Sequence, residues 1–436
     1  EKSLSFFGNR SKQNGPCGKL INSNRLRKMR NRHALPFSCL LVLSVLVTAF
    51  CASAQSTAAW EVPDECAAFD KLYHKMEAID QEEDATLVVL YIGGSHVQAG
   101  WMGHGLRREL AAWAPNAQQS RGMMLPYRIA ETNTPTHFRT EFTGAWQSHI
   151  CTRNTAPLTQ PSPIATGITV LPETDSNQDT HWIQHVGYFP DSSRVKSSEL
   201  TLWTNATKNQ WKWTGNSKLK AATPLPNMGG WHIELAQPAD TFSIEFIPEL
   251  GSNIWYAGMD ASAPVSGPSY TVHEWGHNGL RASHINEIEG WEELLKTLRP
   301  DLIFIGLGLN DAMDGSHLNM EQFQSNYAKL THALRRSKAA IVLMTNTPVL
   351  QHKPAVTSAS TAIKKFLRDH ASAHDMGFWD MGMAVQRARN EASEGLDQWY
   401  KPDGIHFTEF GYTRISEVLF GAWKNGYSTW SKSIRP

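Results

Sequence analysis

The feature that most constrains the fold is a set of continuous apolar runs, rich in β-branched residues, each followed by a segment of helical periodicity. The first run spans residues 86–94 (TLVVLYIGG), and two more span 301–308 and 339–346. Such runs, which lack polar alternation, are typical of strands buried on both faces, as in a parallel sheet covered by helices. This alternation predicts an α/β fold with three layers, a parallel sheet between two layers of helices.

The segments between these runs show the spacing of helix faces. Phe69, Leu72 and Met76 lie at steps of three and four, which predicts a helix before the first strand. The same pattern predicts further helices at residues 98–113, 320–334, 362–374 and 409–423, and a short strand at 377–380. The helices and strands therefore alternate along both the early and the late parts of the chain.

The middle of the chain, residues 134–272, follows a different pattern. Segments 199–204, 231–235 and 241–247 alternate apolar and polar residues with period two, and turn-forming residues separate them. This pattern predicts half-buried antiparallel strands, most simply a β-sandwich inserted into the α/β domain. The expected organisation is a helical segment at 55–84, an α/β domain in two parts at 85–133 and 273–436, and the insertion between those parts.

Eight of the sixteen tryptophans lie between residues 134 and 275. Indole faces suit stacking on sugar rings, so Trp211 and Trp213, which share one face of a polar strand, are candidate glycan contacts. Core packing is the alternative for both residues. It is the preferred interpretation for Trp203 and Trp231, which alternate with aliphatic neighbours.

The N-terminal residues 1–54 have the pattern of a leader. From Met29, a candidate initiator, basic residues precede an apolar run at 38–50 and a small-x-small end at Ala54. This is typical of a secretory signal peptide, and we expect cleavage near Ala54. A membrane anchor is the alternative, although the run is shorter than the roughly 20 residues that span a bilayer.

Removal of this leader changes the charge balance. The whole sequence carries 41 basic and 41 acidic residues, but nine basic residues and one acidic residue precede Gln55. The exported chain would therefore carry 32 basic and 40 acidic residues, a net charge of −8. An acidic chain of this kind argues against a nucleic-acid partner. Cys66 and Cys151 would remain, either as one disulfide or as two separate thiols.

Three short motifs at strand ends carry the candidate chemistry. GGSH places Ser95 directly after the first strand, at the carboxyl edge of the sheet, where open α/β folds bind ligands. GLGLND places Asn310, an N–H₂ donor, after a later strand. PDGIHF places Asp403 and His406 three residues apart, so that the carboxylate could orient the imidazole as in a Ser-His-Asp triad.

Each motif has a simpler explanation when taken alone. Gly-Gly-Ser also forms tight turns, and Asn310 with Asp311 could form a turn and helix cap. Asp403 and His406 could be metal ligands, although no Cys/His cluster at metal spacing accompanies them.

Together the motifs resemble the SGNH, or GDSL-like, hydrolase family, whose blocks occur in this order. The resemblance covers about 86–130 and 270–423 and implies a flavodoxin-like α/β/α fold. It implies Ser95 as nucleophile, His406 as general base and Asp403 as the residue that orients it. The oxyanion hole would be formed by the N–H of Ser95, the N–H of Gly279 and the amide of Asn310. The family uses no metal or cofactor.

One position departs from the family pattern, because Gly94 stands where the family has Asp. In the family, that Asp is not the acid of the catalytic triad. The departure therefore concerns how the Ser95 loop is positioned, and through that the rate of catalysis. The residues at 96–98 and 120–133 resemble a subgroup related to bacterial peptidoglycan O-acetylesterases, which carries a β module at this point. Ser95 and Gly279 are 184 residues apart, whereas a strand-helix-strand unit takes about 30.

The resemblance implies a secreted or periplasmic esterase that removes O-acetyl groups from a glycan, preferably peptidoglycan. Acetylated plant or capsular polysaccharide is the alternative substrate. A protein of another class would also fit, namely a non-catalytic glycan-binding protein with a decayed site. A lipase or thioesterase is a third hypothesis, but no amphipathic lid segment indicates one. The sequence leaves the oligomeric state open.

Overall fold

The computed structural model describes residues 60–153, 165–173, 180–225, 229–249, 253–262, 266–350 and 354–434. The expected leader and signal peptide at residues 1–54 lie outside this part of the chain. In the described residues, no helix combines the length and the apolar character needed to cross a membrane.

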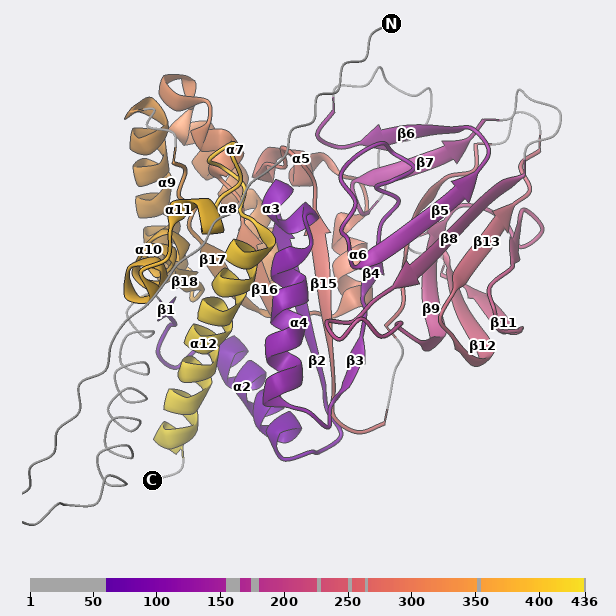
Figure 1. Ribbon diagram of the computed structural model, residues 1–436, viewed down its shortest axis with the longest axis horizontal. Coiled ribbons are helices and arrows are strands. Elements are labelled where there is room, and N and C mark those ends of the chain that lie inside the picture. Colours follow the sequence, from indigo (N-terminus) through magenta and orange to yellow (C-terminus); the bar gives the residue numbers. More distant parts are fainter. Residues whose placement is uncertain are drawn as a thin grey trace, which may run out of the picture. The chain divides into compact units, whose positions relative to one another are not determined.

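A seven-stranded sheet forms the centre of the α/β part (Figure 1). Its strands lie in the order β1 (Trp60–Glu61), β18 (Gly377–Trp379), β17 (Ala340–Met344), β16 (Leu302–Gly306), β2 (Thr86–Gly93), β15 (Ser269–Gly276) and β3 (Gln118–Ser120). All neighbouring pairs are parallel except β1 and β18, which are antiparallel. The α/β prediction is confirmed, but the sheet is mixed rather than wholly parallel.

Alternate residues of β2 face two different layers of helices. Leu87, Val89 and Tyr91 pack in one hydrophobic cluster, whereas Leu90 and Ile92 pack in the other. The first cluster includes α2 (Ala67–Asp80), α4 (Trp101–Trp113), α10 (Met381–Ala392) and α12 (Glu409–Ile434). The second includes α5 (Ala282–Glu287), α6 (Trp291–Leu298), α8 (Met320–Arg335) and α9 (Pro354–Ala373). The continuous apolar run therefore reflects burial on both faces of the strand.

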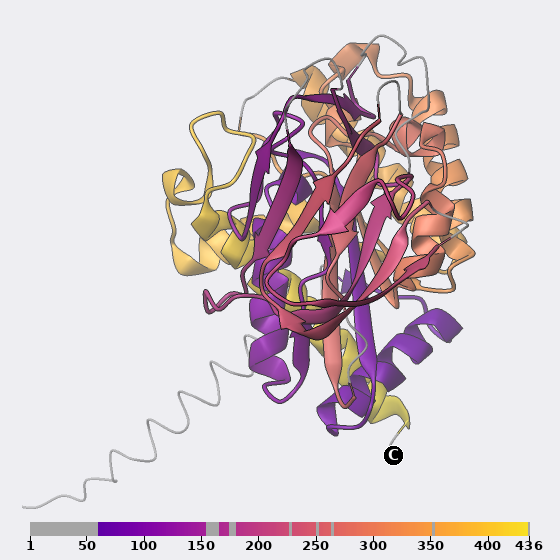
Figure 2. The ribbon, with the colours of Figure 1, turned by 90° about the vertical axis from the view of Figure 1, so that its right-hand side faces the viewer.

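The middle of the chain forms two antiparallel sheets, seen from their own side in Figure 2. One has the order β10 (Trp211–Trp213), β13 (Phe242–Phe246), β8 (His181–Gly187) and β5 (Phe138–Thr143). The other has the order β11 (Leu219–Pro224), β12 (Trp231–Ala239), β9 (Ser197–Thr204), β14 (Tyr256–Asp260), β7 (Ile168–Pro172) and β6 (Trp146–Ile150). Ile183 and Ile244 of the first sheet share a hydrophobic cluster with Leu202 and Ile233 of the second. We call these strands the β module.

The chain crosses between the two parts at different residues from those expected. β4 (Met123–Met124) pairs with β14 of the β module, before the expected boundary at residue 134. β15 pairs with β2 from Ser269 onward, before the expected boundary at residue 272. β4 has only two residues, and β15 mixes apolar with polar residues (SYTVHEWG), so hydrophobic pattern alone does not say which sheet each of them joins.

Candidate active site

Ser95 lies at the carboxyl edge of the central sheet. β2 ends at Gly93, and Ser95 begins the short helix α3 (Ser95–Gln98). A Cβ at Gly93 would lie 2.4 Å from Val97 Cγ2, so the turn into α3 requires glycine at this position. The Ser95 side chain is therefore held by a tight connection between a buried strand and a helix.

The structure brings Ser95, His406 and Asp403 into one hydrogen-bonded chain. His406 Nε2 lies 2.8 Å from Ser95 Oγ, and His406 Nδ1 lies 2.7 Å from Asp403 Oδ2. The other carboxylate oxygen, Asp403 Oδ1, accepts the backbone N–H groups of Ile405 and His406, each at 2.9 Å. In this arrangement His406 Nδ1–H donates to Asp403 and Nε2 is free to accept from the Ser95 hydroxyl.

The hydrogen bonds to Asp403 keep its carboxylate charged. Partial burial raises the pKa of Asp403, but the hydrogen bonds from His406 and from the two backbone N–H groups outweigh it and lower the pKa to about 2. The loop that carries this carboxylate is itself fixed, because Leu350 N donates to Gly404 O at 2.8 Å and Tyr400 Oη donates to Pro348 O at 3.1 Å.

A second histidine, to which the sequence assigned no role, lies against His406. The His96 ring centroid is 5.1 Å from that of His406. His96 Nδ1 is hydrogen-bonded to Tyr412 Oη at 2.9 Å and Nε2 to Thr347 Oγ1 at 3.1 Å. Burial lowers the pKa of His96 to about 3, so this ring stays neutral beside His406. In the sequence, the position of His96 directly after Ser95 was the only indication that it lies at this site.

Asn310 and Gly279 lie in loops at the ends of the two strands that flank β2. Asn310 is in α7 (Leu309–Ala312), which follows β16, and Gly279 lies in the loop after β15 with φ +81°. Asn310 Nδ2 donates to Leu280 O at 3.0 Å, which ties the two loops together. A Cβ at Gly94 would lie 2.9 Å from Asn310 Nδ2, so the Asn310 amide occupies space beside the Ser95 turn.

The structure corrects the interpretation of Trp211 and Trp213 as glycan contacts. Their exposed fractions are only 3% and 8%. Trp211 packs against Trp231, and Trp213 Nε1 donates to Ser217 O at 2.8 Å. Both indoles face inward, so they stabilise the β module and do not offer a surface to a sugar.

Cys66 and Cys151 are both free thiols. Of the two alternatives, one disulfide or two separate thiols, the structure has the second. Within the described ranges, no group of three or more His, Cys, Asp or Glu side chains is arranged to hold a metal ion.

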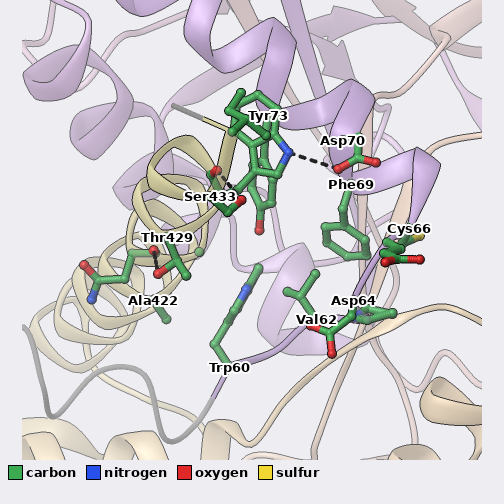
Figure 3. A pocket seen from close by; sticks show the side chains of 16 residues that line it. Trp60, Val62, Asp64, Cys66, Phe69, Asp70, Tyr73, Ala422, Thr429 and Ser433 are labelled. Atoms are coloured by element: carbon green, nitrogen blue, oxygen red, sulfur yellow. Dashed lines mark hydrogen bonds between the residues drawn. The ribbon is translucent and has the colours of Figure 1, made fainter. Parts of the chain in front are cut away.

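A pocket of about 600 Å³ lies away from this site, between α2 and the second half of α12 (Figure 3). Trp60, Phe69, Tyr73 and Trp430 contribute its aromatic lining. Its lining on α12 begins at Ala422, roughly 20 Å along the helix from Glu409, where the helix begins close to the triad loop. The pocket is therefore separate from the chemistry of Ser95.

Comparisons with known proteins agree with this arrangement. Residues 255–414 match the model of the GDSL-like Lipase/Acylhydrolase family. The match includes the segments with Gly279, Asn310, Asp403 and His406, but it begins after Ser95. No curated protein sequence matches the chain.

Solved structures resemble the chain to different extents. A structure described as a peptidoglycan O-acetylesterase in action superposes with a TM-score of 0.64 at 19% identity, covering 84% of this chain and 99% of that one. A catalytic mutant of an acetylxylan esterase from Geobacillus stearothermophilus has a TM-score of 0.30 at 16% identity, covering 35% and 71%. A lipase/acylhydrolase from Enterococcus faecalis has a TM-score of 0.30 at 19% identity, covering 36% and 76%. The first likeness establishes a shared fold that includes the β module.

Proposed function

We propose that this chain is a serine esterase that removes O-acetyl groups from a glycan. The observation that carries the proposal is the hydrogen-bonded chain from Asp403 through His406 to Ser95, at 2.7 and 2.8 Å. The match to the GDSL-like acylhydrolase model supports ester hydrolysis as the reaction class. No other set of side chains in the described residues combines a nucleophile, a base and an orienting carboxylate in this order.

The proposed reaction begins with attack of Ser95 Oγ on the acetyl carbonyl carbon. His406 Nε2 takes the hydroxyl proton, and Asp403 stabilises the resulting imidazolium. The backbone N–H groups of Ser95 and Gly279 and the amide of Asn310 would donate to the oxyanion. The tetrahedral intermediate then collapses, and the sugar alkoxide leaves with the proton from His406. Water, activated by His406, attacks the acetyl-enzyme and releases acetate.

Peptidoglycan is the preferred substrate in this proposal. It is supported by the fold shared with a peptidoglycan O-acetylesterase and by the export signal expected at residues 1–54. Both support a location outside the cytoplasm, secreted or in the periplasm. We also propose that the two antiparallel sheets form a β-sandwich inserted into the hydrolase domain. Acetylated plant or capsular polysaccharide remains the alternative substrate.

Hydrolysis of p-nitrophenyl acetate by the chain from Gln55 to Pro436 tests the chemistry. The parent should turn over this ester, and Ser95→Ala should reduce hydrolysis to the uncatalysed background. Equal rates for the two proteins would reject Ser95 as nucleophile. Acetate release from O-acetylated cell wall and from acetylated xylan then separates the two glycan classes. Pull-down on peptidoglycan without acetate release would support the non-catalytic glycan-binding hypothesis instead.

A further inference from the structure

The loop from His277 to Arg281, which carries Gly279, is held on one side by the hydrolase part of the chain. His277 N donates to Gly93 O at 3.2 Å, and Asn278 N donates to Gln98 Oε1 at 2.5 Å. These contacts join the loop to the turn around Ser95. They act on the backbone at the start of the loop, and the hydrogen bond from Asn310 Nδ2 to Leu280 O holds its end.

The side chains of Trp275 and His277 are held by the β module through a single carbonyl group, that of Thr166 just before β7. Thr166 O accepts from Trp275 Nε1 and from His277 Nε2, each at 2.7 Å. Trp275 precedes Gly276, the last residue of β15, and His277 begins the loop. The Thr166 hydroxyl lies 3.0 Å from Ile168 O and 3.1 Å from Ala257 O, both within the β module. Thr166 therefore joins the β module to both residues that flank Gly276.

The groups in this connection are fully buried and electrically neutral. Thr166 and Trp275 are 0% exposed and His277 is 1% exposed. Burial lowers the pKa of His277 to about 4. Because a carbonyl can only accept, His277 Nε2 carries the proton, and Nδ1 has no hydrogen-bond partner among the described residues. His277 is thus a permanent Nε2–H donor at neutral pH.

The residues around the contact between Thr166 and His277 are closely packed. Gly167 has φ +76°, and a Cβ there would lie 3.0 Å from both His277 Nε2 and Cys151 Sγ. Glycine at position 167 therefore permits the close approach of the β module to His277.

We propose that the β module helps to hold the active site in position. In this proposal His277 and Trp275 are positioning residues for the Gly279 N–H. The inference rests on the proposed esterase function. Glycine loses more conformational freedom than any other residue when it is ordered, so Gly279 at φ +81° needs support from its neighbours. A donor must lie within about 0.5 Å of its productive position to stabilise an oxyanion. The Thr166 carbonyl supplies that support from outside the hydrolase part.

Paired substitutions at His277 test this role with p-nitrophenyl acetate. His277→Leu removes the donor to Thr166 O, whereas His277→Gln keeps an N–H near the position of Nε2. We expect His277→Leu to lower kcat by about 10- to 100-fold, less than the 10²–10³ typical for loss of an oxyanion donor itself. KM should stay within about twofold. His277→Gln should retain kcat within about fivefold of the parent, because it restores the hydrogen bond.

His185→Leu is the matched control. His185 is a buried histidine of the β module whose two nitrogens are hydrogen-bonded to Thr140 Oγ1 and Tyr256 Oη at 2.9 and 2.7 Å. Its removal should lower the melting temperature of the protein and leave kcat unchanged. If it lowers kcat as much as His277→Leu does, general destabilisation explains both effects and the proposal is overturned.

Trp275→Phe tests the same connection if His277→Leu does not fold. This variant keeps an aromatic ring at position 275 and removes the indole N–H that donates to Thr166 O. It should lower kcat by about fivefold or more with KM unchanged. Unchanged kcat in Trp275→Phe, or equal losses in His277→Gln and His277→Leu, would overturn the proposal. Failure of the esterase function itself would be distinct, because the parent would then show no more hydrolysis than Ser95→Ala.

Discussion

His406 Nε2 lies 2.8 Å from Ser95 Oγ, although 311 residues separate them in the sequence. The contact forms because β2 and the loop before α12 both end at the same edge of the central sheet. The β module and five further strands of the central sheet (β3, β15, β16, β17 and β18) lie between the two residues along the chain, yet the sheet brings the two residues together.

Replacement of Asp403 by Asn should lower kcat for p-nitrophenyl acetate by about 10²–10⁴-fold, because Asn does not hold His406 in the Nδ1–H tautomer or stabilise its charged form. KM should change little. Asp397→Asn, which changes an exposed carboxylate on the nearby helix α11 (Leu396–Trp399), is the control. A kcat for Asp403→Asn within threefold of the parent would contradict the role of Asp403.

Restoration of the family residue by Gly94→Asp should lower kcat by about 10-fold or more, not raise it. A Cβ at position 94 would lie 2.9 Å from Asn310 Nδ2 and displace that amide. Gly94→Ala should have a similar effect because the Cβ is the cause. Gly421→Ala, where no atom lies within 4 Å of the added Cβ, is the control. A faster Gly94→Asp enzyme would show that glycine at this position weakens catalysis.

Trp211→Ala should lower the free energy of unfolding by about 3–5 kcal/mol, the usual cost of removing a buried Trp side chain. Urea denaturation measures this loss. Trp211→Phe should fold and retain glycan binding in a pull-down assay, since the indole is 3% exposed. A folded Trp211→Phe protein that no longer binds glycan would restore Trp211 as a glycan contact.

The protein should lose stability as the pH falls below about 6.5. Burial lowers the pKa values of His96, His137 and His185 to about 3 from an ordinary value of 6.5. Between these values the unfolded chain binds protons that the folded protein does not, so each histidine makes the free energy of unfolding rise with pH by up to about 1.4 kcal/mol per unit.

His185→Gln isolates one of these contributions. The difference in free energy of unfolding between pH 7 and pH 5, measured by urea denaturation, should be smaller in this variant by about 2 kcal/mol. An unaltered pH dependence in His185→Gln would mean that the pKa of His185 is not lowered in the folded protein.

Local patterns were sufficient for the order of the helices and strands and for the choice of Ser95, Asn310, Asp403 and His406. An apolar run recurs wherever a strand is buried on both faces, and residues at the carboxyl ends of parallel strands share one edge. The residues at that edge could therefore be named in advance, and the structure places Ser95, His406 and Asp403 within hydrogen-bond distance of one another. Their catalytic roles stay predictions until the variants are measured.

Contacts between distant segments could not be inferred in this way. Trp211 and Trp213 alternate with a polar residue as exposed strand residues often do, yet the facing sheet covers them. The antiparallel pairing of β1 with β18 depends on a two-residue strand that no periodicity identifies.

The sequence by itself determined the α/β alternation, the β-rich middle and the residue types at the sheet edge, because each depends on a pattern within a few neighbouring residues. Only the tertiary structure decided that His96 lies neutral against His406, that Asn310 fills the space beside Gly94, and that Thr166 of the β module holds His277. Burial and hydrogen-bond partners are set by which surfaces meet, and segments 100 or more residues apart supply those surfaces.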